Sequence, residues 1–377
     1  MSSTNYSLTD HIRFTYDILD SMVDWVRVVD KKGEVIFTNK SMMKGMSKFR
    51  LDAPCHIAMG KDCPCRVCIT RASIENGEVT EKEELIEGRI FSVKSAPVRN
   101  PDGEIYAAVE VFRDITREKK LEKELITTNK KMKNDLDFSR KLQQKILPKK
   151  GICGNFEIDY LYEASEALSG DMFDVYKIDD RYTGIYVSDV VGHGVTASMM
   201  TMFIRQTMRG IQDYYINPNK VIKELHRRFL QLQLDDDKYF TIFYGILNNI
   251  DNTFTYVNGG HNCIPFLVSQ NKVELLKTSG FPISSLFNKV DYEECTVKIE
   301  EGDYLILYTD GILEAKSRVG EQFGMDRLRD IVRLNSTNPI ESIKKYVKDY
   351  NYNTSMDDLA IIKAAFVKVD QDKFFLG

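Results

Sequence analysis

Apolar and polar residues alternate along the first hundred residues in the manner of β-strands. Trp25–Asp30 and Glu34–Asn39 are two such runs, and a Lys-Lys-Gly turn separates them. Arg89–Val98 and Ile105–Phe112 form a second pair around a Pro-Asp-Gly turn. Alternation bounded by glycine or proline is typical of β-hairpins. The pattern therefore predicts an N-terminal antiparallel sheet.

A long helix is predicted next. Residues 116–147 contain no glycine or proline, are rich in strong helix formers and end at Pro148. Two sets of positions repeat every seven residues, namely Leu125, Met132, Ser139 and Ile146, and Leu121, Thr128, Asp135 and Leu142. This repeat is apolar at both ends and polar in the middle. We predict a parallel coiled-coil linker over residues 117–148, and hence a homodimer, with a single solvated helix as the alternative.

After Pro148 the pattern becomes mixed. Helices are expected at 196–209 and 218–234, and strands at Thr183–Asp189, Tyr239–Leu247, Thr253–Asn258 and Tyr304–Tyr308. Strand-rich runs with segregated helices favour a layered α+β domain of about 215 residues. The fold class predicted for the chain is therefore α+β.

Composition narrows the class of protein. The chain has 377 residues, of which 43% are hydrophobic and 29% charged, as in soluble proteins of two or three domains. No apolar run approaches the roughly 18 residues of a membrane span, and the first residues lack a signal-peptide pattern. A cytoplasmic protein is expected. The net charge of −4 argues against a nucleic-acid partner, although residues 113–150 carry 13 Lys and Arg against 6 Asp and Glu.

Four of the seven cysteines lie in one short segment, as Cys55, Cys63, Cys65 and Cys68. Without an export signal, thiols or metal ligands are favoured over disulfides. The C-x2-C spacing can chelate a metal, but C-x7-C-x-C is not the spacing of ordinary zinc fingers. Three interpretations stay open: a Zn²⁺ or iron–sulfur site, a redox-active dithiol flanked by Lys61 and Arg66, and ordinary reduced thiols.

Aspartates recur at the ends of predicted strands in the C-terminal part, as Asp171, Asp189, Asp310 and Asp357. Carboxylates at neighbouring strand ends can converge, and converging carboxylates repel unless a cation lies between them. An all-oxygen ligand set suits Mg²⁺ or Mn²⁺, and two such ions can promote displacement at phosphorus. A single Asp-Gly pair is typical of a turn, so the prediction depends on all four positions together.

The N-terminal part carries Val29-Asp30, Gly33, Val35 and Asn39, and it ends with Val111–Glu122, where a strand finishes in Asp-Ile-Thr and leads into the helix. In these features residues 14–116 resemble a PAS sensor domain. The resemblance implies an antiparallel sheet with helices that senses a signal and passes it to the linker.

Seven motifs follow one another in the C-terminal part: Ser169–Asp174, Ser188–Met200, Phe240–Leu247, Thr255–Asn262, Glu301–Ala315, Gly320–Leu328 and Met356–Leu359. In this order they resemble the metal-dependent protein phosphatases over residues 155–369. The closest likeness is to the bacterial branch typified by the stage II sporulation phosphatase and the stress-response sigma-regulator phosphatases. The segment Leu142–Pro148 also resembles the helix that leads into the family's catalytic domain.

The resemblance implies an α/β/β/α sandwich that hydrolyses phosphoserine or phosphothreonine on a protein with two Mn²⁺ or Mg²⁺ ions. Asp189 matches the bridging carboxylate, and the Val190 carbonyl matches its neighbouring ligand. Asp171, Asp310 and Asp357 match the other metal-binding carboxylates of the family. Asp358, which follows Asp357, is not expected to bind a metal ion directly. Asp189 and Asp310 are the expected catalytic carboxylates. The expected substrate is a phosphorylated anti-sigma-factor antagonist, whose dephosphorylation controls sigma-factor activity.

Two histidines and two departures from the family pattern qualify the resemblance. His193 either donates a proton to the leaving hydroxyl or lies in a turn needed only for its backbone, and His261 is either a loop residue or adjacent to the site. Ser169 replaces a family glycine, and Ala360 replaces a threonine. Since all four aspartates are present, an active enzyme is expected. The alternatives are a non-catalytic redox- or ligand-sensing module that sequesters a partner, and a two-metal phosphohydrolase for small phosphoesters.

Overall fold

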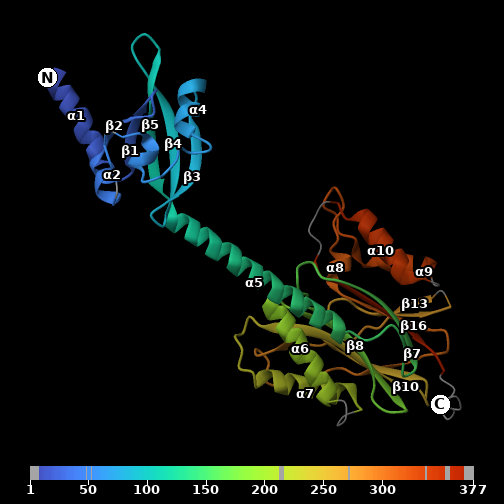
Figure 1. The fold of residues 1–377 in the computed structure, drawn as a ribbon. Coiled ribbons are helices and arrows are strands. Elements are labelled where there is room, and N and C mark those ends of the chain that lie inside the picture. The colour runs from blue at the N-terminus through green and yellow to red at the C-terminus, as the bar shows by residue number, and fades with distance from the viewer. Residues whose placement is uncertain are drawn as a thin grey trace, which may run out of the picture. The chain divides into compact units, whose positions relative to one another are not determined.

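The computed structural model describes residues 8–47, 49–51, 53–211, 216–270, 272–335, 338–352 and 357–368. Met356 and the predicted domain end at residue 369 lie outside these ranges. The chain divides into two compact units, Met1–Lys131 and Met132–Gly377 (Figure 1). Within the described ranges, no helix is both long and apolar enough to cross a membrane.

The N-terminal unit is built on a five-stranded antiparallel sheet with the strand order β2-β1-β5-β4-β3. The strands are β1 (Trp25–Asp30), β2 (Val35–Thr38), β3 (Thr80–Ile86), β4 (Arg89–Arg99) and β5 (Ile105–Asp114). Both predicted hairpins are confirmed as β1–β2 and β4–β5. Strand β1 also pairs with β5, which joins the two hairpins into one sheet.

Four helices of this unit lie in the described ranges. They are α1 (Leu8–Ser21), α2 (Lys40–Gly45), α3 (Cys55–Ala58) and α4 (Ile69–Asn76). Helix α4 packs on β3, β4 and β5, and α2 packs on β1. Asn39 begins α2, because its side-chain oxygen accepts hydrogen bonds from the backbone N–H groups of Met42 and Val26. Trp25 and Phe91, with ring centroids 4.4 Å apart, lie in the apolar core.

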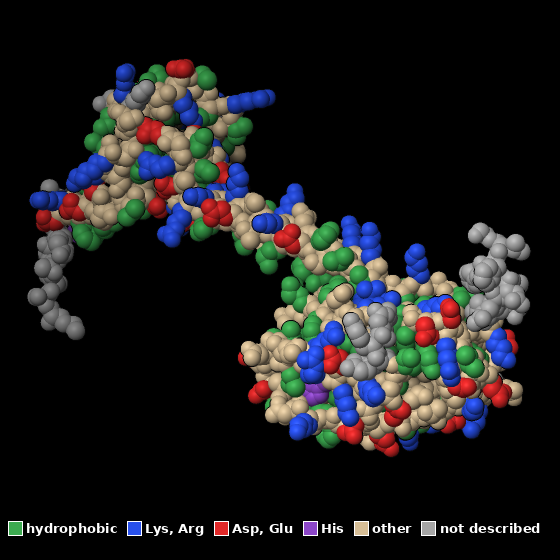
Figure 2. Space-filling view, turned by 90° about the horizontal axis from the view of Figure 1, so that it is seen from below, with side chains coloured by type: hydrophobic (Ala, Val, Ile, Leu, Met, Phe, Trp, Pro, Cys, Tyr) green, Lys and Arg blue, Asp and Glu red, His purple; other side chains and the backbone are tan. Residues whose placement is uncertain are grey.

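The predicted helix is present as α5 (Thr116–Ile146), 31 residues long. Its N-terminus is fixed by the Thr116 hydroxyl, which accepts a hydrogen bond from the Ile90 N–H at 2.9 Å. Apolar and basic side chains are exposed along the helix (Figure 2). The exposed apolar ones are Leu121, Leu125, Ile126, Met132, Phe138 and Leu142.

The C-terminal unit contains two antiparallel sheets. One has the order β15-β11-β10-β9-β8, with β14 added to β10, and the other has the order β13-β12-β16-β17-β7-β6. The first sheet comprises β8 (Asp171–Lys177), β9 (Tyr182–Val190), β10 (Tyr239–Asn248), β11 (Thr253–Gly259), β14 (Ile283–Ser284) and β15 (Cys295–Lys298). The second comprises β6 (Gly151–Cys153), β7 (Phe156–Glu163), β12 (Phe266–Ser269), β13 (Lys272–Leu275), β16 (Tyr304–Tyr308) and β17 (Leu359–Phe366).

Helices cover the outer faces of both sheets and complete an α/β/β/α sandwich (Figure 1). Helices α6 (Gly194–Ile211) and α7 (Pro218–Leu230) pack on the first sheet, and α9 (Gly324–Leu334) and α10 (Pro339–Tyr350) pack on the second. The short α8 (Asp310–Leu313) follows β16. The predicted α+β layers are therefore present. Helix α7 ends at Leu230, four residues before the predicted end, because Leu232 and Gln233 make turn hydrogen bonds instead.

Strands such as β16 have continuous apolar sequences because both of their faces are buried. All five residues of β16 are buried, because the strand has the other sheet on one face and α9 and α10 near the other. Phe173 and Val187 of the first sheet and Leu305 and Leu307 of the second lie in one core between the sheets. This core holds the two sheets together and so fixes their ends relative to each other.

Candidate active site

Two of the predicted aspartates lie side by side on the first sheet. Asp171 is the first residue of β8 and faces Asp189, near the end of β9, in the antiparallel register. Strand β9 then ends in a tight turn, in which Gly192 and Gly194 have φ angles of 89° and 77°. This left-handed backbone is one that glycine adopts at little cost. The turn leads directly into α6.

The second sheet supplies Asp310 and Asp357. Asp310 follows β16 and begins α8, and Asp357 precedes β17. A Cβ added to Gly311 would lie 2.0 Å from the Asp358 carbonyl oxygen, so the backbones of these two segments approach closely. The Asp310-Gly311 pair is therefore not an isolated turn. The glycine allows the start of α8 to lie against the segment that carries Asp357.

Asp358 connects the two sheets. Its Oδ2 accepts a hydrogen bond of 2.6 Å from the Gly170 N–H, and its Oδ1 accepts bonds of 2.8 Å from the N–H and hydroxyl of Ser165. These bonds hold the loop that leads into β8. Asp358 is buried, and its oxygens accept hydrogen bonds from the protein itself, whereas the neighbouring Asp357 is exposed.

The carboxylates from the two sheets influence one another strongly. Burial, followed by the charges of Asp310 and Asp357, raises the pKa of Asp189 to about 7. Burial and the charge of Asp189 raise the pKa of Asp171 well above its usual value, and burial and Asp357 raise that of Asp310. A cation between these groups would relieve the repulsion. Negative charge is thus concentrated where the ends of the two sheets meet.

The residues present fit a divalent cation. The four carboxylates and the Val190 carbonyl offer only oxygen, the donor that Mg²⁺ and Mn²⁺ prefer. The buried Oδ2 of Asp171 has no hydrogen-bond partner within the protein, so it is free to bind an ion. Among the residues that the structure describes, no three His, Cys, Asp or Glu side chains form a ready-made metal-binding group.

His193 lies at the surface. Its side chain is 70% exposed, and its Nδ1 lies 3.2 Å from a carboxylate oxygen of Glu166. It lies between the two glycines of the turn after β9. This position favours the interpretation that the segment is needed for its backbone turn. The proton-donor role stays a hypothesis.

His261 lies in the core close to the site. It is 3% exposed, and burial lowers its pKa to about 4. Its Nδ1 lies 3.1 Å from the Thr241 hydroxyl, and its Nε2 lies 3.0 Å from the Tyr308 carbonyl oxygen. Thr241 is the register partner of Asp189, and Tyr308 precedes Asp310 by two residues. Neutral His261 therefore connects the two sheets beneath the aspartates, which favours the site-adjacent interpretation.

The sequence analysis did not identify Gln143, near the end of α5. Its side-chain Nε2 donates a 2.8 Å hydrogen bond to the Ser169 carbonyl, and its Oε1 accepts one of 3.1 Å from the Ser169 N–H. The Ser169 hydroxyl in turn accepts a bond of 3.0 Å from the Asp171 N–H. The only signal in the sequence is its place in Leu142–Pro148, one of the segments that resembled the family.

The cysteine segment belongs to the N-terminal unit. Cys55, Cys65 and Cys68 line a cavity of about 460 Å³, whereas Cys63 is exposed and does not line it. In the described part of the chain no three of these thiols form a metal-binding group. The arrangement gives no support to a zinc or iron–sulfur site.

The C-terminal unit is a sandwich of two packed sheets. Acidic groups from both sheets lie at one end of the sandwich and form a candidate divalent-cation site. Residues 179–367 match the family model described as Stage II sporulation protein E (SpoIIE), and the chain belongs to this family. The resemblance inferred from the seven motifs is thereby confirmed at the level of the family.

Individual relatives agree with this assignment. The chain is 29% identical over 252 residues to the phosphoserine phosphatase RsbP of Bacillus subtilis (strain 168), covering 65% of this chain and 57% of RsbP. It is 27% identical over 192 residues to the phosphoserine phosphatase RsbU of the same organism, covering 50% of this chain and 56% of RsbU. The chain therefore spans just over half the length of these relatives.

A solved structure supports the fold. The SiaA-PP2C domain of Pseudomonas aeruginosa is similar with a TM-score of 0.56 and 21% identity, covering 63% of this chain and 98% of that domain. At this identity the likeness concerns the fold of the C-terminal unit.

Proposed function

We propose that this protein is a metal-dependent protein serine/threonine phosphatase. The observation that carries the proposal is the pairing of Asp171 with Asp189 on one sheet, close enough to Asp310 and Asp357 of the other that their charges raise the pKa of Asp189. Two relatives in the same family bear the name phosphoserine phosphatase. This favours catalysis over the alternative of a non-catalytic binding module.

Two Mn²⁺ or Mg²⁺ ions would activate a water and offset charge on the phosphoryl oxygens. Asp189 and the Val190 carbonyl would hold them from the first sheet together with Asp171, and Asp310 and Asp357 would hold them from the second. Asp358 keeps the loop before Asp171 in place through its bonds to Gly170 and Ser165. His193 is the candidate to protonate the leaving hydroxyl, and Glu166 orients its ring.

The proposed substrate is a phosphorylated anti-sigma-factor antagonist, by the resemblance of the motifs to the sigma-regulator phosphatases. Dephosphorylation of this partner would control sigma-factor activity in a stress response or sporulation. Comparing turnover on a phosphoprotein with turnover on nucleotides separates this proposal from a phosphohydrolase acting on small phosphoesters.

We also propose that residues 14–116 form a PAS sensor, that 117–148 form a coiled-coil linker joining two copies, and that 155–369 form the phosphatase domain. The five-stranded antiparallel sheet with its cavity supports the sensor. The apolar side chains exposed along α5 support the dimer.

The central test is hydrolysis of an aryl phosphate and of a phosphoserine protein with and without Mn²⁺. We expect Asp189→Asn to lower kcat at least about a hundredfold, because one carboxylate and its charge are lost from the metal site. Asp180→Asn is the matched control, since exposed Asp180 lies in the turn at the other end of β8 and β9. Full activity in Asp189→Asn would contradict the proposal.

A further inference from the structure

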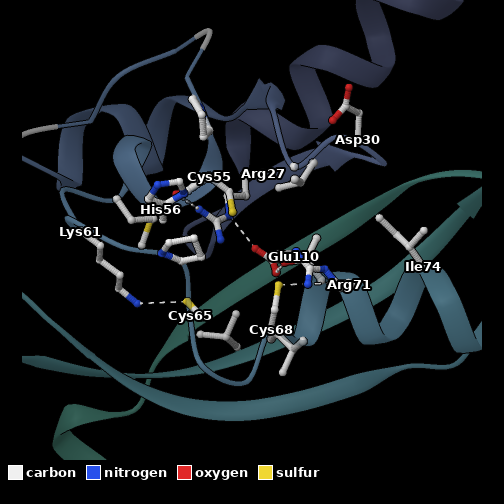
Figure 3. A pocket seen from close by; sticks show the side chains of 18 of the residues that line it. Arg27, Asp30, Cys55, His56, Lys61, Cys65, Cys68, Arg71, Ile74 and Glu110 are labelled. Carbon is white, nitrogen blue, oxygen red and sulfur yellow. Dashed lines mark hydrogen bonds and ion pairs between the residues drawn. The ribbon is translucent and has the colours of Figure 1, made fainter.

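The cavity of the N-terminal unit contains a thiol, Cys65, that two lysines contact, and Figure 3 shows one of them, Lys61, beside it. The Cys65 Sγ lies 3.6 Å from the Lys61 Nζ and 3.9 Å from the Lys82 Nζ. Cys65 is partly accessible, so a small molecule that enters the cavity can reach its sulfur.

The two lysines beside this thiol share one carboxylate partner. Lys61 and Lys82 both pair with the same group, Glu84. Burial opposes ionisation of Glu84, but hydrogen bonds from the two lysines outweigh it and lower its pKa. The other interior carboxylate, Glu110, is already bound by Arg27 and Thr70. One negative charge thus faces two ammonium groups, and the second group that both lysines contact is the Cys65 sulfur. Two ammonium groups beside this sulfur stabilise the negative charge that develops on it when it reacts.

A second thiol of the same cavity is suited to react with the first. Cys68 is separated from Cys65 by two residues and begins α4, where its Sγ accepts the Arg71 N–H at 3.4 Å. The two other cysteines of the segment are less suited. Burial raises the pKa of the Cys55 thiol, which keeps it protonated, and Cys63 lies outside the cavity.

We propose that Cys65 is the thiol that reduces a hydroperoxide and that Cys68 then closes a disulfide with it. The Cys65 sulfur attacks the terminal peroxide oxygen, so an S–O bond forms and the O–O bond breaks, and the alkoxide leaves as the alcohol with the proton given up by the Cys65 thiol. The Cys68 sulfur next attacks the sulfenic acid, the S–S bond forms and water leaves with the Cys68 proton. Two thiols and one hydroperoxide thus give one disulfide, one alcohol and one water. This chemistry does not depend on the phosphatase proposal.

The first test measures the alkylation rate of each cysteine in the full-length protein at pH 7 with limiting iodoacetamide, read by mass spectrometry. We expect Cys65 to react at least about fivefold faster than exposed Cys63, because two ammonium groups lie beside the Cys65 sulfur and stabilise the negative charge of the attacking sulfur. Lys82→Met should reduce the Cys65 rate about threefold or more, because one of the two neighbouring charges is removed. Lys94→Met, on β4, is the matched control and should leave it unchanged. A Cys65 rate no higher than that of Cys63 would overturn the proposal without reference to any variant.

The second test treats the reduced protein with hydrogen peroxide and then digests it without reductant. We expect one linked product, Cys65–Cys68, two mass units lighter than the dithiol. In Cys68→Ser, the sulfenic acid should be trapped by dimedone on Cys65, and Cys63→Ser should behave as the wild type. Trapping on Cys68 in Cys65→Ser at the same rate would overturn the assigned roles, and a disulfide to Cys63 or Cys55 in place of Cys65–Cys68 would overturn the assigned pair.

Discussion

The most informative single residue near the aspartates is His261, because one neutral ring contacts both sheets. Its partners, Thr241 and Tyr308, lie 20 and 47 positions away in the sequence. A hydrogen bond between such distant groups exists only in the folded chain. The sequence could therefore mark His261 as a candidate but could not assign its role. The same holds for Asp358, whose partners Ser165 and Gly170 precede it by more than 180 residues.

The state of His261 predicts a pH-dependent stability. Its pKa of about 4 in the folded protein lies below the value of about 6.5 expected in the unfolded chain. The unfolded state thus gains the proton first, so this contribution is complete above pH 6.5 and is lost as the pH falls towards 4. Between pH 7 and pH 5 the loss amounts to about 2 kcal/mol.

Denaturant unfolding followed by circular dichroism at these two pH values measures the effect. His261→Gln keeps a polar side chain at this position but does not titrate, so its free energy of unfolding should fall by about 2 kcal/mol less than that of the wild type over this range. His193→Gln is the control, because His193 is exposed, and it should follow the wild type. Equal losses in His261→Gln and wild type would contradict the prediction.

Among the elements, helix α5 was the easiest to predict, and α8 was the hardest. A stretch of 31 residues without glycine or proline specifies a helix through local preferences alone. Asp310-Gly311, by contrast, reads locally as a turn, and it begins a helix because Gly311 approaches the Asp358 backbone. Helices α9 and α10 were not predicted, although each places apolar residues such as Leu328 and Ile343 on one buried face.

The end of α5 carries a testable link to the aspartates. Gln143→Ala would leave the buried N–H and C=O of Ser169 without their partner, at a cost of about 1–3 kcal/mol. Since Ser169 bonds to the Asp171 N–H, this loop should hold its metal ligand less firmly. We expect the Mn²⁺ concentration for half-maximal phosphatase activity to rise about tenfold.

The neighbouring glutamine provides the control for this experiment. Gln144 is exposed on the same helix turn, so Gln144→Ala should retain the metal dependence of the wild type. If the two variants require the same Mn²⁺ concentration, the bonds of Gln143 to Ser169 do not support the site.

At the scale of the whole molecule, the sequence predicted two units joined by a helix and the two-sheet architecture of the second. It also placed the four aspartates at or next to strand ends, because the apolar runs of β9 and β16 lead closely into Asp189 and Asp310. It could not separate the thiols that line the cavity from the one that does not, since Cys63 and Cys65 are only two residues apart. That difference depends on how the loop before α4 folds against β3.

The oligomeric state is the remaining property of the whole molecule that α5 predicts. Leu125 and Met132 are 62% and 58% exposed in a single chain and occupy the same heptad position. Burying them against a second copy removes this apolar surface from water. We therefore expect a dimer in sedimentation equilibrium at micromolar concentration, and a monomer after the double change Leu125→Glu and Met132→Glu, because four carboxylates would then repel across the seam.

Ile126, 61% exposed, lies outside both heptad sets, so Ile126→Glu should remain dimeric. A monomeric wild type would leave α5 as a single solvated helix, and a dimer that survives the double change would have to use another surface.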